Sequence, residues 1–175
     1  LVAVGVAFWI FRQPAPASGL LGQMVSVHQD FVTHRIRPEV EADTPEPLER
    51  FLADRLERRI RIPRGGALKG HAVALVGARL ETFQGHPAGD VLLSCCGFPA
   101  SVFIMDRGAF EADPGVQSAL GAGGVRQPGG LKVKAVLRGS LAVCVVSTHD
   151  TPVMEEVQAL AEALLDPSVL LAETP

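Results

Sequence analysis

The residues of this chain best suited to covalent or metal chemistry are its three cysteines. Cys95 and Cys96 are adjacent in a run of strand-forming residues, and Cys144 lies in the similar run LAVCVV. Because neighbouring residues of a strand point to opposite faces of a sheet, Cys95 and Cys96 should not bind one metal ion together. Buried cysteine usually packs as a small hydrophobe, and we expect that role here. One exception stays open: in an oxidising compartment, Cys144 could form a disulfide with whichever of the other two faces it.

The histidines and serines predict no reactive site. His28 is the best placed candidate for a haem or metal ligand, since it lies on an expected helix. The other histidines fall on a different helix face, at turns or before a helix start: His34, His71, His86 and His149. No cysteine or second histidine stands at metal-ligand spacing from any of them, and no serine lies in a GxSxG motif. The sequence therefore predicts no catalytic, cofactor-binding or metal-binding residue.

The composition is that of one folded domain that does not bind nucleic acid. A chain of 175 residues with 47% apolar and 20% charged residues can bury a substantial core, and it is not disordered in type. The net charge of -3 provides no electrostatic attraction for nucleic acid. Tyrosine is absent and Trp9 is the one tryptophan, so a base-stacking surface is not expected either.

The first residues are apolar enough to contact lipid. Residues 1–11 carry no charge, and they end in Trp-Ile-Phe followed by Arg12, an arrangement typical of a membrane interface. A helix needs about 20 residues to cross a hydrocarbon core of about 30 Å. We therefore expect residues 1–12 to be the C-terminal part of a transmembrane helix, joined by a linker at 13–19. A signal-peptide remnant and a buried core helix are the alternatives.

The remaining pattern predicts an α+β domain over residues 20–166, followed by a tail at 167–175. Apolar residues recur at helical spacing in 20–35, 45–58 and 151–166. Strand patterns occupy 59–63, 71–83, 91–96, 100–105, 131–137 and 141–147. Gly77 stands inside one of these strands, where a bulge or a close backbone approach is expected. Because the helices and strands do not alternate, we expect a mainly antiparallel sheet with helices packed on one face.

Residues 107–130 are expected to form a long loop. The segment is rich in glycine, contains Pro114 and Pro128, and shows no clear periodicity. A loop of this length is either mobile or lies against a partner. Its apolar side chains are therefore our candidate partner contacts: Phe110, Val116 and Leu120.

Between residues 46 and 105 the chain resembles a known family. The matching elements are Phe51-Leu52 in a helix, Ile60-Arg61-Ile62-Pro63 as an edge strand, and Gly70 followed by Leu75-Val76-Gly77-Ala78-Arg79-Leu80. These motifs, LVGARL above all, resemble the extracytoplasmic region of single-pass transmembrane anti-sigma factors. The final strand and helix, LAVCVVSTHDTPVMEEVQALAEAL, are similar to the end of that domain, so the resemblance covers about residues 20–166.

Arg79 in the LVGARL motif has two interpretations. It places a charge on an otherwise apolar strand. It could pair with a carboxylate such as Glu81 or Glu39 on the sheet, which is the commoner role of such a residue. It could instead contact a ligand or a partner, and so it joins the candidate partner contacts.

The resemblance implies a membrane-anchored, non-enzymatic sensor or interaction domain without a cofactor. It implies an inner-membrane protein of a bacterium, with the main domain on the periplasmic side and contacts to other membrane or periplasmic proteins. In that family a sigma factor is bound only through an upstream cytoplasmic region, which these 175 residues do not include. Two alternatives remain: an accessory single-pass subunit of a respiratory or photosynthetic membrane complex, and a haem or redox-cofactor protein that uses His28 or the cysteines.

Overall fold

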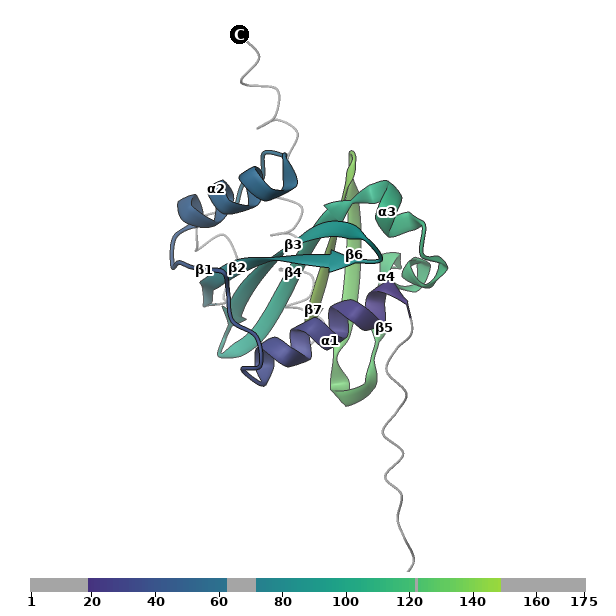
Figure 1. The fold of residues 1–175 in the computed structure, drawn as a ribbon. Helices are drawn as coiled ribbons and strands as arrows, with labels where there is room; N and C mark the ends of the chain where they lie inside the picture. Colours follow the sequence, from purple (N-terminus) through teal and green to yellow (C-terminus); the bar gives the residue numbers. More distant parts are fainter. Residues whose placement is uncertain (1–18, 63–71, 122, 149–175) are drawn as a thin grey trace, which may run out of the picture.

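The described part of the chain is built around one antiparallel sheet. A computed structural model describes residues 19–62, 72–121 and 123–148. Seven strands lie in the order β1-β2-β3-β4-β7-β6-β5, and every neighbouring pair is antiparallel (Figure 1). The strands are β1 Val40–Glu41, β2 Val73–Phe83, β3 His86–Cys95, β4 Phe98–Asp106, β5 Val125–Arg126, β6 Lys132–Arg138 and β7 Leu141–Ser147. The expected α+β class is confirmed.

The two longer helices lie on opposite faces of the sheet, so the expectation that helices cover one face was wrong. Helix α2, Pro45–Leu56, packs through Leu48 and Leu52 on a face formed by residues such as Val102 and Ile104. Helix α1, Leu20–Val32, packs through Leu20, Leu21, Met24 and Val25 on the other face, which includes Phe103 and Met105. Alternate residues of β4 therefore enter two separate cores, and both faces of the central strands are buried. Figure 1 shows the sheet passing between these helices.

The two helices begin where local chemistry allows it. Thr44 takes the extended conformation of a cap residue, and Pro45 occupies the first turn, where its missing N–H is not needed. Helix α1 begins after Gly19 and ends at Val32, slightly before the expected end at residue 35. Its apolar residues recur at spacings of three and four, which places them on one side of the helix.

The interruption expected in the long strand is present. Strand β2 pairs with β3 along its whole length, but the register shifts between Leu75 and Gly77, which is a bulge. A Cβ at Gly77 would lie 2.4 Å from the carbonyl oxygen of Val40 and 2.5 Å from Cβ of Pro38. Glycine thus allows the short strand β1 to approach β2 at this point.

Residues 107–130 are not the long loop that the sequence suggested. They contain two short α-helices, two 3-10 turns and the short strand β5. The helices are α3, Arg107–Glu111, and α4, Gln117–Leu120, and the turns are Pro114–Val116 and Pro128–Gly130. Phe110, Val116 and Ala119 are buried in the core on the α1 side of the sheet, so the segment belongs to the domain.

The expected edge strand at residues 59–63 does not form a ladder in its described part. Residues 59–62 have no strand assignment, yet Ile60 and Ile62 are buried in the core beneath α2. The Ile62 N–H donates instead to the Glu49 carboxylate at 2.8 Å. The alternating isoleucines therefore predicted correctly that one side of this segment is buried. They did not show that it pairs with another strand, and residues 59–62 form no strand.

Several expectations fall on residues that the structure does not describe. They are the transmembrane segment at 1–12, most of the linker at 13–19, the final helix at 151–166 and the tail at 167–175. Within residues 19–62, 72–121 and 123–148, no helix is long and apolar enough to cross a membrane.

Candidate functional site

The two buried cysteines lie on opposite faces of the sheet. Cys95 ends β3 and is buried beneath α2, whereas Cys144 lies on β7 in the core beneath α1. Cys96 is not on a strand: it lies in the β3–β4 turn with φ 52° and is exposed. Burial raises the pKa of Cys144 to about 12, which disfavours the reactive thiolate. Because Cys95 and Cys144 occupy opposite faces of the sheet, the disulfide between them that the sequence left open does not fit this fold.

His28 is a residue of α1, and its side chain contacts the sheet. Its side chain has 0% exposure, and Nδ1 is 3.0 Å from the Ser101 hydroxyl on β4. Among the described residues, Nε2 has no hydrogen-bond partner. Burial lowers the pKa of His28 to about 4, so the imidazole is neutral at physiological pH. His28 is therefore a neutral core residue held by one hydroxyl.

A carboxyl group lies on the same side of the sheet and is equally buried. Asp90 on β3 pairs with Phe103 on β4 and with Arg79 on β2, and directly paired residues share a face. Phe103 belongs to the core beneath α1, so Asp90 and Arg79 point to that side as well. Asp90 has 0% exposure, and neither of its carboxyl oxygens has a hydrogen-bond partner among the described residues.

Charge on this face is concentrated in β2. Arg79 forms an ion pair with Glu81, two residues further along the strand, and this is one of the two partners expected for it. The other expected carboxylate, Glu39, accepts the Leu80 N–H at 2.9 Å. Burial raises the pKa of Glu81 despite Arg79, and burial followed by the charge of Glu81 raises that of Asp90 well above its ordinary value. Burial thus favours the neutral, protonated form of Asp90 beside this ion pair.

Asp113 binds donors from three separate segments of the domain. Its carboxylate accepts hydrogen bonds from the Leu20 N–H at 2.6 Å, the Gly115 N–H at 2.7 Å and the Gln84 side chain at 2.8 Å. Burial alone would raise its pKa, but these hydrogen bonds outweigh burial and lower the pKa. Asp113 thereby joins the first residue of α1 to the β2–β3 turn and to the Pro114–Val116 turn.

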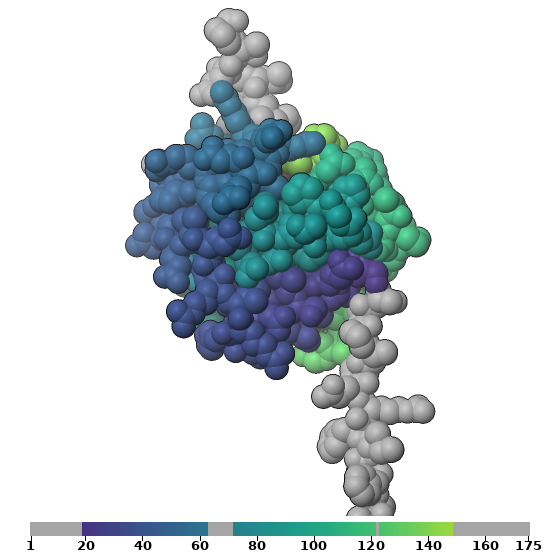
Figure 2. Space-filling view, viewed as in Figure 1, coloured from purple at the N-terminus to yellow at the C-terminus, as the bar shows by residue number. Residues whose placement is uncertain are grey.

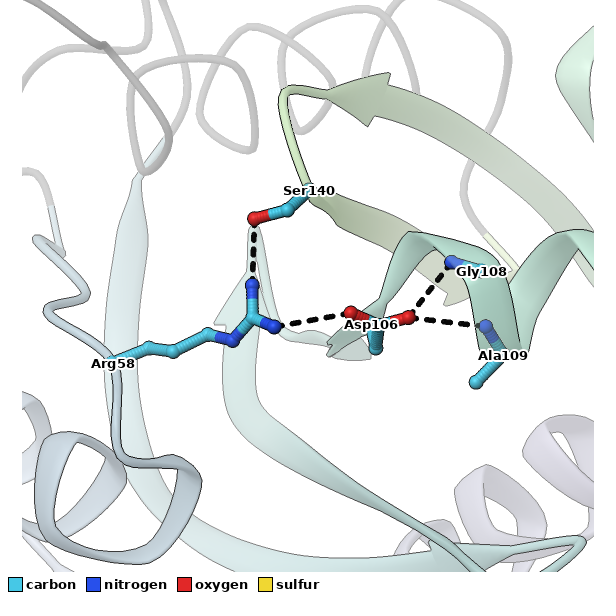
Figure 3. Close-up of polar contacts among 5 residues, drawn as sticks. All are labelled: Arg58, Asp106, Gly108, Ala109 and Ser140. Carbon is cyan, nitrogen blue, oxygen red and sulfur yellow. Dashed lines mark hydrogen bonds and ion pairs between the residues drawn. The ribbon is translucent and has the colours of Figure 1, made fainter.

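A small hollow lies where the end of α2 meets β3, β4 and β7. It has a volume of about 140 Å³, and its walls combine Leu56, Met105 and Leu141 with His86. Arg58 and Asp106 also line it, and Figure 3 shows how they are bound. Arg58 donates to Ser140 Oγ at 2.6 Å and to Asp106 at 3.0 Å. Asp106 also accepts from the N–H groups of Gly108 and Ala109. These groups satisfy one another, so the arrangement ties α2 to the β6–β7 turn and caps α3.

The candidate partner contacts are mostly inside the domain. Phe110 and Val116 have 0% exposure, and Leu120 packs partly buried against the same core. Arg79 is committed to Glu81 and lies 3.4 Å from the Arg37 carbonyl oxygen. The structure does not bring these four residues together on the surface. Among the described large hydrophobic residues, the exposed ones are Val32 and Phe98.

Three polar residues on the α1 side of the sheet were not predicted from the sequence: Ser101, Asp90 and Asp113. The strand expected to start at residue 91 starts earlier, because the turn before it is short and β3 already begins at His86. An Asp before Pro-Gly is a typical start of a helical turn, and that signal in Asp113-Pro114 could have been used. Nothing local to Asp90 in the sequence indicates that it is buried.

No comparison supplies a family for this chain. Among residues 19–62, 72–121 and 123–148, no group of three or more His, Cys, Asp or Glu side chains is arranged to hold a metal ion. No family model, no curated protein and no solved structure matches the chain.

Proposed function

We propose that this chain is the extracytoplasmic sensor or interaction domain of a membrane-anchored, anti-sigma-factor-like regulator. In this proposal residues 1–12 enter the inner membrane and the α+β domain lies on the periplasmic side. The domain binds other proteins and performs no reaction. An upstream region, outside these 175 residues, would bind the sigma factor.

The observation that carries the proposal is the attachment of α1 by Asp113. Helix α1 is the first described element after residues 1–18, and the Leu20 N–H at its start is bound directly by the Asp113 carboxylate. A regulator must transmit a change in its outer domain to its membrane segment. A helix that is fixed to the domain core at the point where the anchor joins it provides such a connection.

The case for a subunit of a membrane complex is weaker than the sequence suggested. That alternative depended on an apolar segment, 107–130, that would need a partner surface. Phe110 and Val116 instead fill the core of their own domain. The redox alternative depended on His28 or on neighbouring cysteines, and these side chains lie apart or deep beneath a helix.

The function can be tested in the bacterium that encodes the protein. We expect that deleting residues 20–148 from the full-length protein changes transcription of a defined promoter set that shares one promoter element. Genome-wide transcript sequencing measures this. A matched strain with the conservative Val32→Ala substitution on the surface of α1 should keep the parental transcript pattern. Unchanged transcription in the deletion strain, together with loss of assembly of a membrane complex, would instead identify a subunit.

A further inference from the structure

We propose that protonation of His28 releases helix α1 from its face of the sheet, so that mild acid opens this domain on one side. The proposal concerns the described domain alone and does not depend on the regulatory function proposed above. It assigns to His28 a role that the family resemblance does not.

The first step is that His28 is buried without an anionic partner. Its contact is the Ser101 hydroxyl, and Nε2 has no hydrogen-bond partner among the described residues. The side chains of β4 and β7 on this face carry no carboxylate: they are Ser101, Phe103, Met105, Ala142, Cys144 and Val146. An imidazolium at this position would be a buried charge without compensation, which is strongly unfavourable.

The ionisable groups farther away do not remedy this. Asp90 lies on the same face, but burial and the charge of Glu81 raise its pKa and so favour its uncharged form. Glu81 is paired with Arg79, so this pair has little net charge. Asp113 is committed to the N-terminus of α1, and Asp30 on the helix itself pairs with Arg35 in solvent. Cys144 remains a neutral thiol.

The second step is that α1 can leave without breaking the sheet. The strands hold one another through their own ladders, and α1 contributes to none of them. Apolar packing fixes the helix, together with the polar contacts of Leu20 and His28 to Asp113 and Ser101. Figure 2 shows α1 at the surface of the domain, with its outer side uncovered along most of its length. Helix α1 is thus the first element of the described fold and can move away from the sheet without breaking a strand pair.

The size of the effect follows from linkage. The pKa of His28 is about 4 in the docked helix and 6.5 when the side chain is in water. The docked state therefore binds fewer protons, and its stability relative to the released state falls as the pH drops from above 6.5 toward 4. Through His28 alone, the released population should rise roughly 30-fold between pH 7.5 and pH 5. The raised pKa of Asp90 does not oppose this while β3 stays covered, since α1 chiefly contacts β4 and β7. The Asp113 pKa lies below its ordinary value, so the Leu20–Asp113 contact adds no pH dependence of its own over this range.

Two buried cysteines provide a reporter and an internal control. Cys144 lies beneath α1, whereas Cys95 lies on the opposite face beneath α2, and each is 1% exposed. In the full chain in detergent, with the exposed Cys96 changed to Ser, a disulfide reagent that reacts at acid pH would label both thiols. The ratio of the two labelling rates at each pH removes the pH dependence of the reagent's own reactivity.

We expect the Cys144 to Cys95 labelling ratio to rise roughly 30-fold from pH 7.5 to pH 5. The rise should disappear in His28→Gln, which keeps a side chain able to bond Ser101 but does not titrate. If that variant does not fold, His28→Leu serves, because it requires no hydrogen bond. Equal acceleration of both cysteines would indicate global unfolding and overturn the proposal. So would an unchanged ratio in the wild-type protein, or a rise that persists in the His28 variants.

Discussion

Replacing Phe110 by alanine is expected to destabilise the domain by about 3–5 kcal/mol, the usual cost of removing a fully buried phenylalanine. Phe110 has 0% exposure and lies in the core between α1 and the sheet, with Val116 and Ala119 in the same cluster. The change would leave a cavity that the short helices around it are poorly placed to fill. Urea unfolding of the full chain in detergent, followed by circular dichroism, measures the loss.

The Phe98→Ala variant is the matched control. Phe98 is 50% exposed at the β3–β4 turn, so the same truncation should cost clearly less. The two variants separate the structural interpretation of Phe110 from the sequence-based one. If Phe110 were an exposed partner contact, its truncation would leave the urea midpoint unchanged and weaken only an assembly.

Replacing Asp113 by alanine is expected to cost about 2–4 kcal/mol, because it removes three charge-assisted hydrogen bonds and leaves the buried Leu20 N–H without an acceptor. The donors are the N–H groups of Leu20 and Gly115 and the side chain of Gln84. Leu20 is itself 1% exposed, so water cannot easily replace the carboxylate. Amide hydrogen exchange along α1 should accelerate in this variant, most of all at the start of the helix.

The same variant has a pH signature. The folded pKa of Asp113 lies below the unfolded value of 3.8, so its stabilising contribution is complete above that value. The contribution disappears as the pH falls through the lower, folded pKa, because both states are then protonated. The stability difference between wild type and Asp113→Ala should thus be constant near neutrality and shrink in strong acid.

Asp106→Ala, which removes a more exposed helix cap, should cost only about 1 kcal/mol. An equal loss from both variants would contradict the role of Asp113.

The fold could be predicted from the sequence wherever a local pattern decided the structure. Helical spacing from residue 45 predicted α2, and Gly77 predicted the bulge. Apolar runs predicted the strands around Leu93, Val102 and Val143. These features depend on neighbours in the chain. Even so, a continuous apolar run such as SVFIM is typical of a strand buried on both faces, and that indication of helices on both sides was not used.

The rest could not be predicted because it depends on contacts between distant residues. The 107–130 segment lacks periodicity because its helices are single turns, each with only one or two buried side chains. The pairing of His28 with Ser101 spans 73 positions, and that of Leu20 with Asp113 spans 93. Asp90 resembled a turn residue because it follows Gly89, and because an aspartate rarely lies in a core.

The location of the domain is the claim on which the proposed function most directly depends, and Cys96 can test it. Cys96 is exposed in the β3–β4 turn, whereas Cys95 and Cys144 are buried, so a membrane-impermeant maleimide should react selectively with Cys96. We predict that the full-length protein in intact spheroplasts is labelled without lysis, and that the Cys96→Ser variant loses this signal. Labelling of Cys96 only after the membrane has been disrupted would contradict a periplasmic domain.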